Sequence, residues 1–114
     1  MATPSIEIDA ILFEREPGCW VGQCLQYDVG AQAETLPDLA YQLERAIVGY
    51  AVTCAAREIE PFSELESAPR EYWDLWRKAT LSVVSSGEPR FRAPRRVAVP
   101  KTTMKVAEGE RKAA

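Results

Sequence analysis

The chain has 114 residues, 46% of them hydrophobic, which is enough for one compact domain with a modest core and too little for a second. It contains neither an apolar run of 18 residues nor a basic and then apolar leader, so the sequence favours a cytoplasmic protein outside the membrane. The formal net charge of −3 hides an asymmetry, because residues 1–86 carry 14 acidic and 6 basic side chains whereas residues 87–114 carry 3 and 8.

The first third of the chain predicts an antiparallel meander of three strands. Apolar residues alternate with Glu7 and Asp9 along the first strand, which is the period-two pattern of a sheet with one buried face. Ile11 and Phe13 indicate that the far end of this strand is covered on both faces. Pro17-Gly18 supplies a turn, because proline presets φ and glycine accepts a positive φ. The three strands are expected at residues 5–14, 19–25 and 27–33.

A long amphipathic helix is predicted next. Thr35 is suited to accept a backbone hydrogen bond as N-cap, and Pro37 lies in the first turn, where its missing donor costs nothing. Asp38 adds a negative charge near the positive end of the helix. Apolar residues then repeat every three or four positions, so one face packs on the sheet. We expect the helix to end near Arg57 and residues 58–62 to form a brief returning edge strand.

The rest of the sequence predicts a connector, a second helix and a basic tail. A helical face of Tyr72, Leu75, Trp76 and Ala79 is followed by Gly87 as a C-terminal stop. Beyond it the chain has three prolines and no helical period, so we expect it to be largely extended or disordered, with residues 95–99 as its only strand-like segment. The expected units are residues 1–62, 63–87 and 88–114.

Two segments, "IEIDAILFEREPGCWVGQC" and "AQAETLPDLAYQLERAI", resemble the HicB-like antitoxin family over roughly residues 5–62. The resemblance implies an α+β, partial ribonuclease H-like fold, with three antiparallel strands, a helix across one face and a short edge strand. The chain departs from the family at Ala33-Glu34-Thr35, where a Gly-Asp-Thr corner is typical, and at "LQYDVG", which replaces a Pro-Asp-Leu-Pro-Gly-Cys segment. Nothing after Gly87 looks like the DNA-binding module of longer members, so DNA binding is not carried over.

The residue types point away from catalysis. The chain has no histidine, which excludes Ser-His, Cys-His and His-metal machinery. Glu7 and Asp9 share a strand face like the paired carboxylates of ribonuclease H folds, but a two-metal site needs carboxylates from several elements, so a solvated face is the better interpretation. The cysteines at 19, 24 and 54 form no C-x-x-C pair and are expected to be reduced and packed in apolar surroundings. We expect no catalytic residue, metal or cofactor.

By resemblance, the chain is a non-catalytic antitoxin that sterically masks a small basic HicA-like ribonuclease. Complementary charge would speed the encounter, and apolar contacts would supply affinity. The expected contacts are Glu7, Asp9, Asp28 and Glu34, with Trp20 either an anchor or, more simply, a core residue.

Two alternatives remain open. One is a stand-alone homo-oligomeric adaptor that uses the second helix and tail. The other is nucleic-acid binding, in which Tyr72, Trp73 and Trp76 stack on bases or fill a core, and the tail contacts phosphates. The tail residues are Arg90, Arg92, Arg95 and Arg96.

Overall fold

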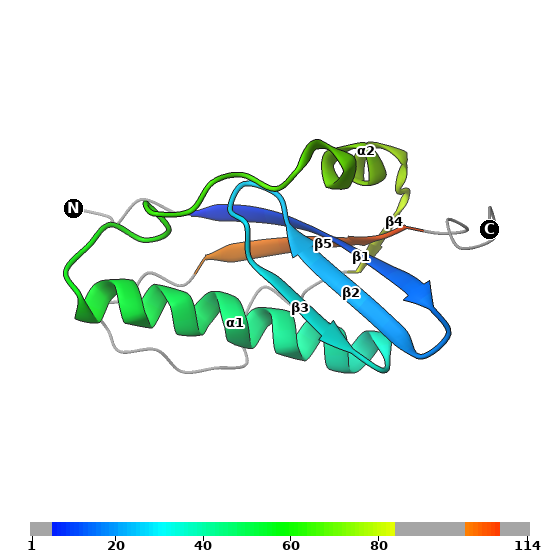
Figure 1. Ribbon diagram of the computed structural model, residues 1–114, viewed down its shortest axis with the longest axis horizontal. Coiled ribbons are helices and arrows are strands. Elements are labelled where there is room, and N and C mark those ends of the chain that lie inside the picture. The colour runs from blue at the N-terminus through cyan, green and yellow to red at the C-terminus, as the bar shows by residue number, and fades with distance from the viewer. Residues whose placement is uncertain (1–5, 84–99, 108–114) are drawn as a thin grey trace.

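Strands from distant parts of the chain build one mixed five-stranded sheet (Figure 1). The structure is a computed structural model that describes residues 6–83 and 100–107. β1 is antiparallel to β2 and parallel to β5, and the outer pairs β2–β3 and β4–β5 are antiparallel. In sheet order the strands are β3 (Gly30–Ala33), β2 (Cys19–Cys24), β1 (Glu7–Glu16), β5 (Lys101–Val106) and β4 (Leu81–Val83).

The expected three-stranded meander is present. β1 and β2 form a hairpin whose register runs from Ala10 opposite Cys24 to Glu16 opposite Cys19, with an irregularity after Glu14. Gly18 has a φ of 77° in the connecting turn, a conformation that glycine adopts without steric cost. β3 is shorter than expected, because the chain bends at residues 25–27 and is irregular at Asp28 and Val29.

The helix α1 (Leu36–Ala56) packs on one face of the sheet. Thr35 is its N-cap, and the Thr35 Oγ1 accepts a hydrogen bond from the Asp38 N–H at 3.3 Å. The helix ends at Ala56 with Arg57 as C-cap, so the predicted start and end are both confirmed. Its buried side chains join those of β1, β2 and β5 in one core cluster, which includes Ile8, Ala10, Leu12, Cys24, Leu39, Leu43, Ile47, Ala51 and Met104.

The edge strand expected at residues 58–62 does not form, and that prediction was wrong. Glu58 and Phe62 have φ values of 56° and 62°, which strand residues do not adopt. Local turn hydrogen bonds replace strand pairing, such as Ile59 N–H to the Cys54 carbonyl at 3.0 Å and Leu65 N–H to the Phe62 carbonyl at 3.1 Å. The segment closes the end of the core instead, because the Phe62 side chain is fully buried.

The second helix, α2 (Arg70–Lys78), lies on the opposite face of the sheet from α1 (Figure 1). It is shorter than predicted, because Ala79 is already extended, with a ψ of 132°, and β4 begins at Leu81. A second cluster of buried residues lies under it and consists of Ile11, Leu25, Ala68 and Ala79. The expectation that the far end of β1 is covered on both faces is therefore confirmed. Gly87 and residues 95–99 lie outside the described residues.

β5 comes from the segment that was expected to be extended or disordered, and it pairs with β1 along six residues, from Glu7 opposite Lys101 to Leu12 opposite Val106. Met104 of β5 is 1% exposed and belongs to the same core cluster as α1. The C-terminal region thus supplies an inner strand of the sheet. In the described part of the chain, neither helix combines the length and apolarity that a bilayer crossing requires.

Candidate functional site

The five predicted contact residues fall on two different parts of the sheet. Glu7 and Asp9 lie on β1, and Trp20 lies on β2. Asp28 and Glu34 stand just before and just after β3, the outermost strand on that side of the sheet, and both are exposed. The carboxylates of Asp28 and Glu34 therefore lie near the two ends of one edge strand, while the other predicted residues lie on inner strands.

Asp9 is held by a reciprocal pair of hydrogen bonds with Gln26. The Gln26 Nε2 donates to the Asp9 Oδ2 at 2.8 Å, and the Asp9 backbone N–H donates to the Gln26 Oε1 at 2.8 Å. Glu7, two residues earlier on the same face of β1, is exposed. Within residues 6–83 and 100–107, no three or more His, Cys, Asp or Glu side chains are grouped so that they could hold a metal ion.

Asp28 is positioned by a buried amide. Gln23 is 8% exposed, and its Nε2 donates to the Asp28 Oδ1 at 2.7 Å and to the Cys24 carbonyl at 3.1 Å. The Asp28 backbone N–H donates to the Glu66 carbonyl at 2.7 Å, which ties the start of β3 to the segment before α2. The carboxylate is thus fixed in direction while it stays open to solvent.

The backbone of β3 offers hydrogen-bonding groups on the side away from β2, where no other strand in the described part of the chain pairs with it. The Cys24 N–H donates to the Val29 carbonyl at 2.8 Å, which places these two opposed residues at a hydrogen-bonded position of the ladder, while the Val29 N–H donates to the Tyr27 carbonyl at 2.8 Å. Hydrogen-bonded pairs alternate with non-hydrogen-bonded ones in an antiparallel ladder. Gly30 and Gln32, which are opposite Gln23 and Val21, therefore direct their N–H and C=O groups away from β2. The sequence pattern predicted this strand but did not predict that it would lie at the edge of the sheet.

Trp20 is a poorer contact candidate. It is half-buried and packs against the core cluster under α1. It stands opposite Glu14 on β1, near the hairpin turn. This placement agrees with the simpler interpretation that the side chain contributes to the core.

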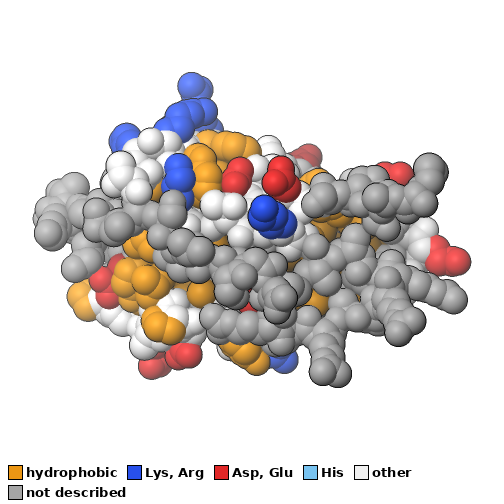
Figure 2. Space-filling view, turned by 180° about the vertical axis from the view of Figure 1, so that it is seen from behind, with side chains coloured by type: hydrophobic (Ala, Val, Ile, Leu, Met, Phe, Trp, Pro, Cys, Tyr) orange, Lys and Arg blue, Asp and Glu red, His pale blue; other side chains and the backbone are white. Residues whose placement is uncertain are grey.

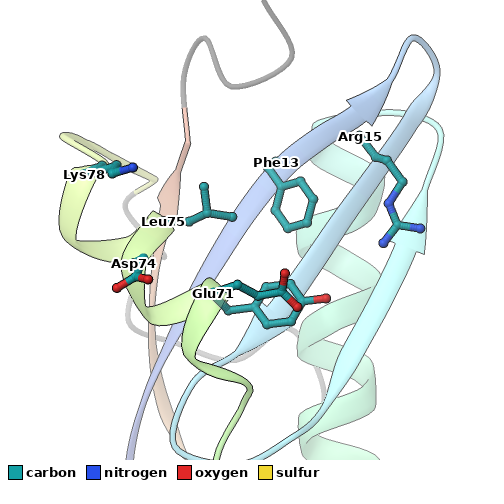
Figure 3. A pocket seen from close by; sticks show the side chains of 7 residues that line it. Phe13, Arg15, Glu71, Asp74, Leu75 and Lys78 are labelled. Carbon is teal, nitrogen blue, oxygen red and sulfur yellow. The ribbon is translucent and has the colours of Figure 1, made fainter. Parts of the chain in front are cut away.

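A groove runs between α2 and the sheet, and no motif in the sequence predicted it. A hollow of about 410 Å³ lies along α2, and a second of about 260 Å³ continues over β2 and β3. Arg15 and Tyr72 line both hollows, and Figure 3 shows the Phe13 ring directed toward the end of α2 that carries Glu71. The rings of Phe13 and Tyr72 lie 6.1 Å apart. Glu71, Asp74 and Lys78 of α2 add charges of both signs.

The aromatic side chains of α2 pack partly against the sheet. Tyr72, Trp73 and Trp76 are half-buried against the cluster under α2. The Lys105 Nζ lies 4.1 Å from the centre of a Trp76 ring, a cation–π contact that joins α2 to β5. These contacts fit the interpretation in which the rings fill a core or an interface.

The buried cysteines are unsuited to nucleophilic chemistry. Burial raises the pKa of the Cys24 thiol from 9.0 to about 12, so the reactive thiolate is scarce near neutral pH. Cys54 of α1 is 2% exposed, and Cys19 is half-buried. All three are free thiols.

The described surface is acidic overall. Residues 6–83 and 100–107 contain 14 acidic and 8 basic side chains. Figure 2 shows the side opposite to that of Figure 1, where several basic side chains gather at the upper left and acidic side chains are visible at several separate places. The last turn of α2 contributes Arg77 and Lys78 to the basic set. The four tail arginines named above, at 90, 92, 95 and 96, lie outside the described residues.

Comparison with protein-family models, curated proteins and solved structures finds no match to this chain.

Proposed function

We propose that this chain is a non-catalytic protein-binding module of the HicB-like antitoxin type, which sterically masks a small basic ribonuclease of the HicA-like kind. The observation that carries the proposal is the β3 edge, beside which residues 6–83 and 100–107 place no further strand, with the exposed carboxylates of Asp28 and Glu34 near its two ends. A surface of this kind suits a basic protein, because opposite charge accelerates encounter and backbone groups supply contacts.

The architecture supports the proposal at a coarse level. The HicB-like resemblance implies three antiparallel strands and a helix across one face, and β1, β2, β3 and α1 have that arrangement. The strand beside β1 follows α2 and β4 in the chain rather than following α1 directly. The partial ribonuclease H-like assignment is therefore part of the proposal and extends it to a chain with an added helix and strand.

Coexpression with the small open reading frame beside the gene tests the function. Growth arrest by that product alone, relief of the arrest by this chain, and recovery of a one-to-one complex are the expected results. A lone homo-oligomer with no relief of arrest would reject the antitoxin function and favour the adaptor alternative.

A further inference from the structure

We infer that the outer edge of β3 binds an extended strand of the protein partner beside Gly30–Ala33, with Lys or Arg near the carboxylates of Asp28 and Glu34. The inference rests on the proposed function, which supplies a basic partner, and it specifies how that partner is held. The sheet would grow from five strands to six, with the added strand beside Gly30–Ala33.

The first argument concerns the backbone. Gly30 and Gln32 each direct one N–H and one C=O away from β2, as derived above from the Val29–Cys24 hydrogen bond. An edge with such groups is a template for a further strand. The two residues offer two donors and two acceptors to an incoming chain.

The second argument concerns side chains on the face toward α1. Val29, Ala31 and Ala33 are all half-buried and pack against the core cluster. An added strand would place side chains beside them and remove more of their apolar surface from water. The partner strand should therefore carry small or apolar residues at alternate positions.

The third argument disfavours a second copy of this chain as the occupant. Two copies of β3 that pair antiparallel about Ala31, with matching faces, bring Asp28 of each copy toward Glu34 of the other. Like charges that face each other across paired strands are destabilising, and this pairing creates two such contacts. A foreign strand with two basic residues six positions apart, matching the spacing of Asp28 and Glu34, reverses the sign of both contacts.

The test uses the full chain and capped synthetic peptides, followed by NMR. The basic probe has threonine and valine between two lysines six positions apart, and the matched probe has glutamates in place of the lysines. We expect the basic probe to bind and to slow hydrogen exchange at the Gly30 and Gln32 amides, and the acidic probe to bind more weakly by about tenfold or more.

Two pairs of variants separate strand addition from general charge attraction. Gln32→Pro removes an outward N–H that has no partner within the sheet, so the fold should persist while the dissociation constant of the basic probe rises by about tenfold or more; Gln32→Thr keeps the donor and should bind normally. Glu34→Lys should weaken binding, whereas Glu71→Lys on α2 makes the same charge change away from the edge and should have little effect.

The inference would be overturned if both probes bind equally well, or if binding slows hydrogen exchange at amides other than those of Gly30 and Gln32. Asp28 and Glu34 would then be charges that protect a short edge strand from aggregation. The coexpressed complex distinguishes this failure from failure of the function. If the toxin complex forms equally well with Gln32→Pro and Gln32→Thr, strand addition at β3 is rejected and the antitoxin function is supported. If the peptide binds but no toxin complex forms, strand addition is supported and the antitoxin function is rejected.

Discussion

The ring of Phe62 stacks on the ring of Tyr27, with centroids 4.9 Å apart and planes 24° apart. Tyr50 stacks on Phe62 as well, with centroids at 5.4 Å. The three rings join the loop after α1, the helix itself and the loop before β3. They explain why Phe62 holds a positive φ of 62°, since burial of the aromatic ring offsets the cost of that conformation.

Phe62→Ala is expected to lower the free energy of unfolding by about 3–5 kcal/mol, because it leaves a cavity between two tyrosine rings. Phe62→Leu keeps most of the apolar volume and should cost less. Urea unfolding followed by tryptophan fluorescence measures both. Equal stability of Phe62→Ala and the parent chain would contradict the packing described here.

Gly22 and Gly49 should respond oppositely to alanine. A Cβ at Gly22 would lie 3.0 Å from the Leu12 Cδ2 and 3.2 Å from both the Leu39 Cδ1 and the Leu43 Cδ2. Gly22→Ala should therefore destabilise the chain by about 1–3 kcal/mol, because these three leucine side chains must shift within the packed core. A Cβ at Gly49, on the exposed side of α1, meets nothing within 4 Å, and Gly49→Ala should stabilise by about 0.5–1 kcal/mol. Paired denaturation curves decide the signs.

The buried Cys24 thiol predicts a loss of stability at high pH. Its pKa is raised to about 12, from 9.0, by desolvation. Between these pH values the unfolded chain has lost a proton that the folded chain retains, so the free energy of unfolding falls as pH rises from 9 toward 12, and the contribution is complete below pH 9. Cys24→Ala should show a shallower decline over the same range. Identical slopes for the two proteins would refute this origin of the pH dependence.

Two truncated chains should show that stability depends on β5 and not on the residues that follow it. A chain that ends at Ala107 keeps β5, whereas a chain that ends at Pro100 loses it and exposes one side of β1, together with the pocket that Met104 fills. We expect cooperative thermal unfolding of the first chain and loss of the cooperative transition in the second. A Pro100-terminated chain that unfolds like the full chain would show that β5 is dispensable.

Local signals predicted the parts of the fold that depend on near neighbours. The Pro17-Gly18 turn defines the β1–β2 hairpin, and Thr35 with Asp38 defines the start of α1, so both were readable from a few adjacent residues. β5 was not predicted as a strand, because its pairing with β1 spans most of the chain and leaves little local trace. The strand expected at 58–62 was wrong because turn hydrogen bonds and the burial of Phe62 outweigh its short apolar pattern.

The candidate site was predictable in its charges and not in its geometry. Asp28 and Glu34 could be chosen as exposed acidic residues, but their placement at the two ends of a free strand follows from the sheet order. The Asp9–Gln26 pair and the Gln23–Asp28 bond join residues whose side-chain partners have no sequence signature. The groove beside α2 likewise requires a helix–sheet contact that the sequence does not encode locally.

The parallel pairing of the first and last described strands has a consequence for biosynthesis. β1 leaves the ribosome well before β5, which is its neighbour on one side. Until β5 is made, the nascent chain presents an unpaired inner strand with apolar side chains, the kind of intermediate that chaperones recognise. Completion of the sheet therefore waits for synthesis of β5, and folding should be slower than for a chain of similar size built from local contacts.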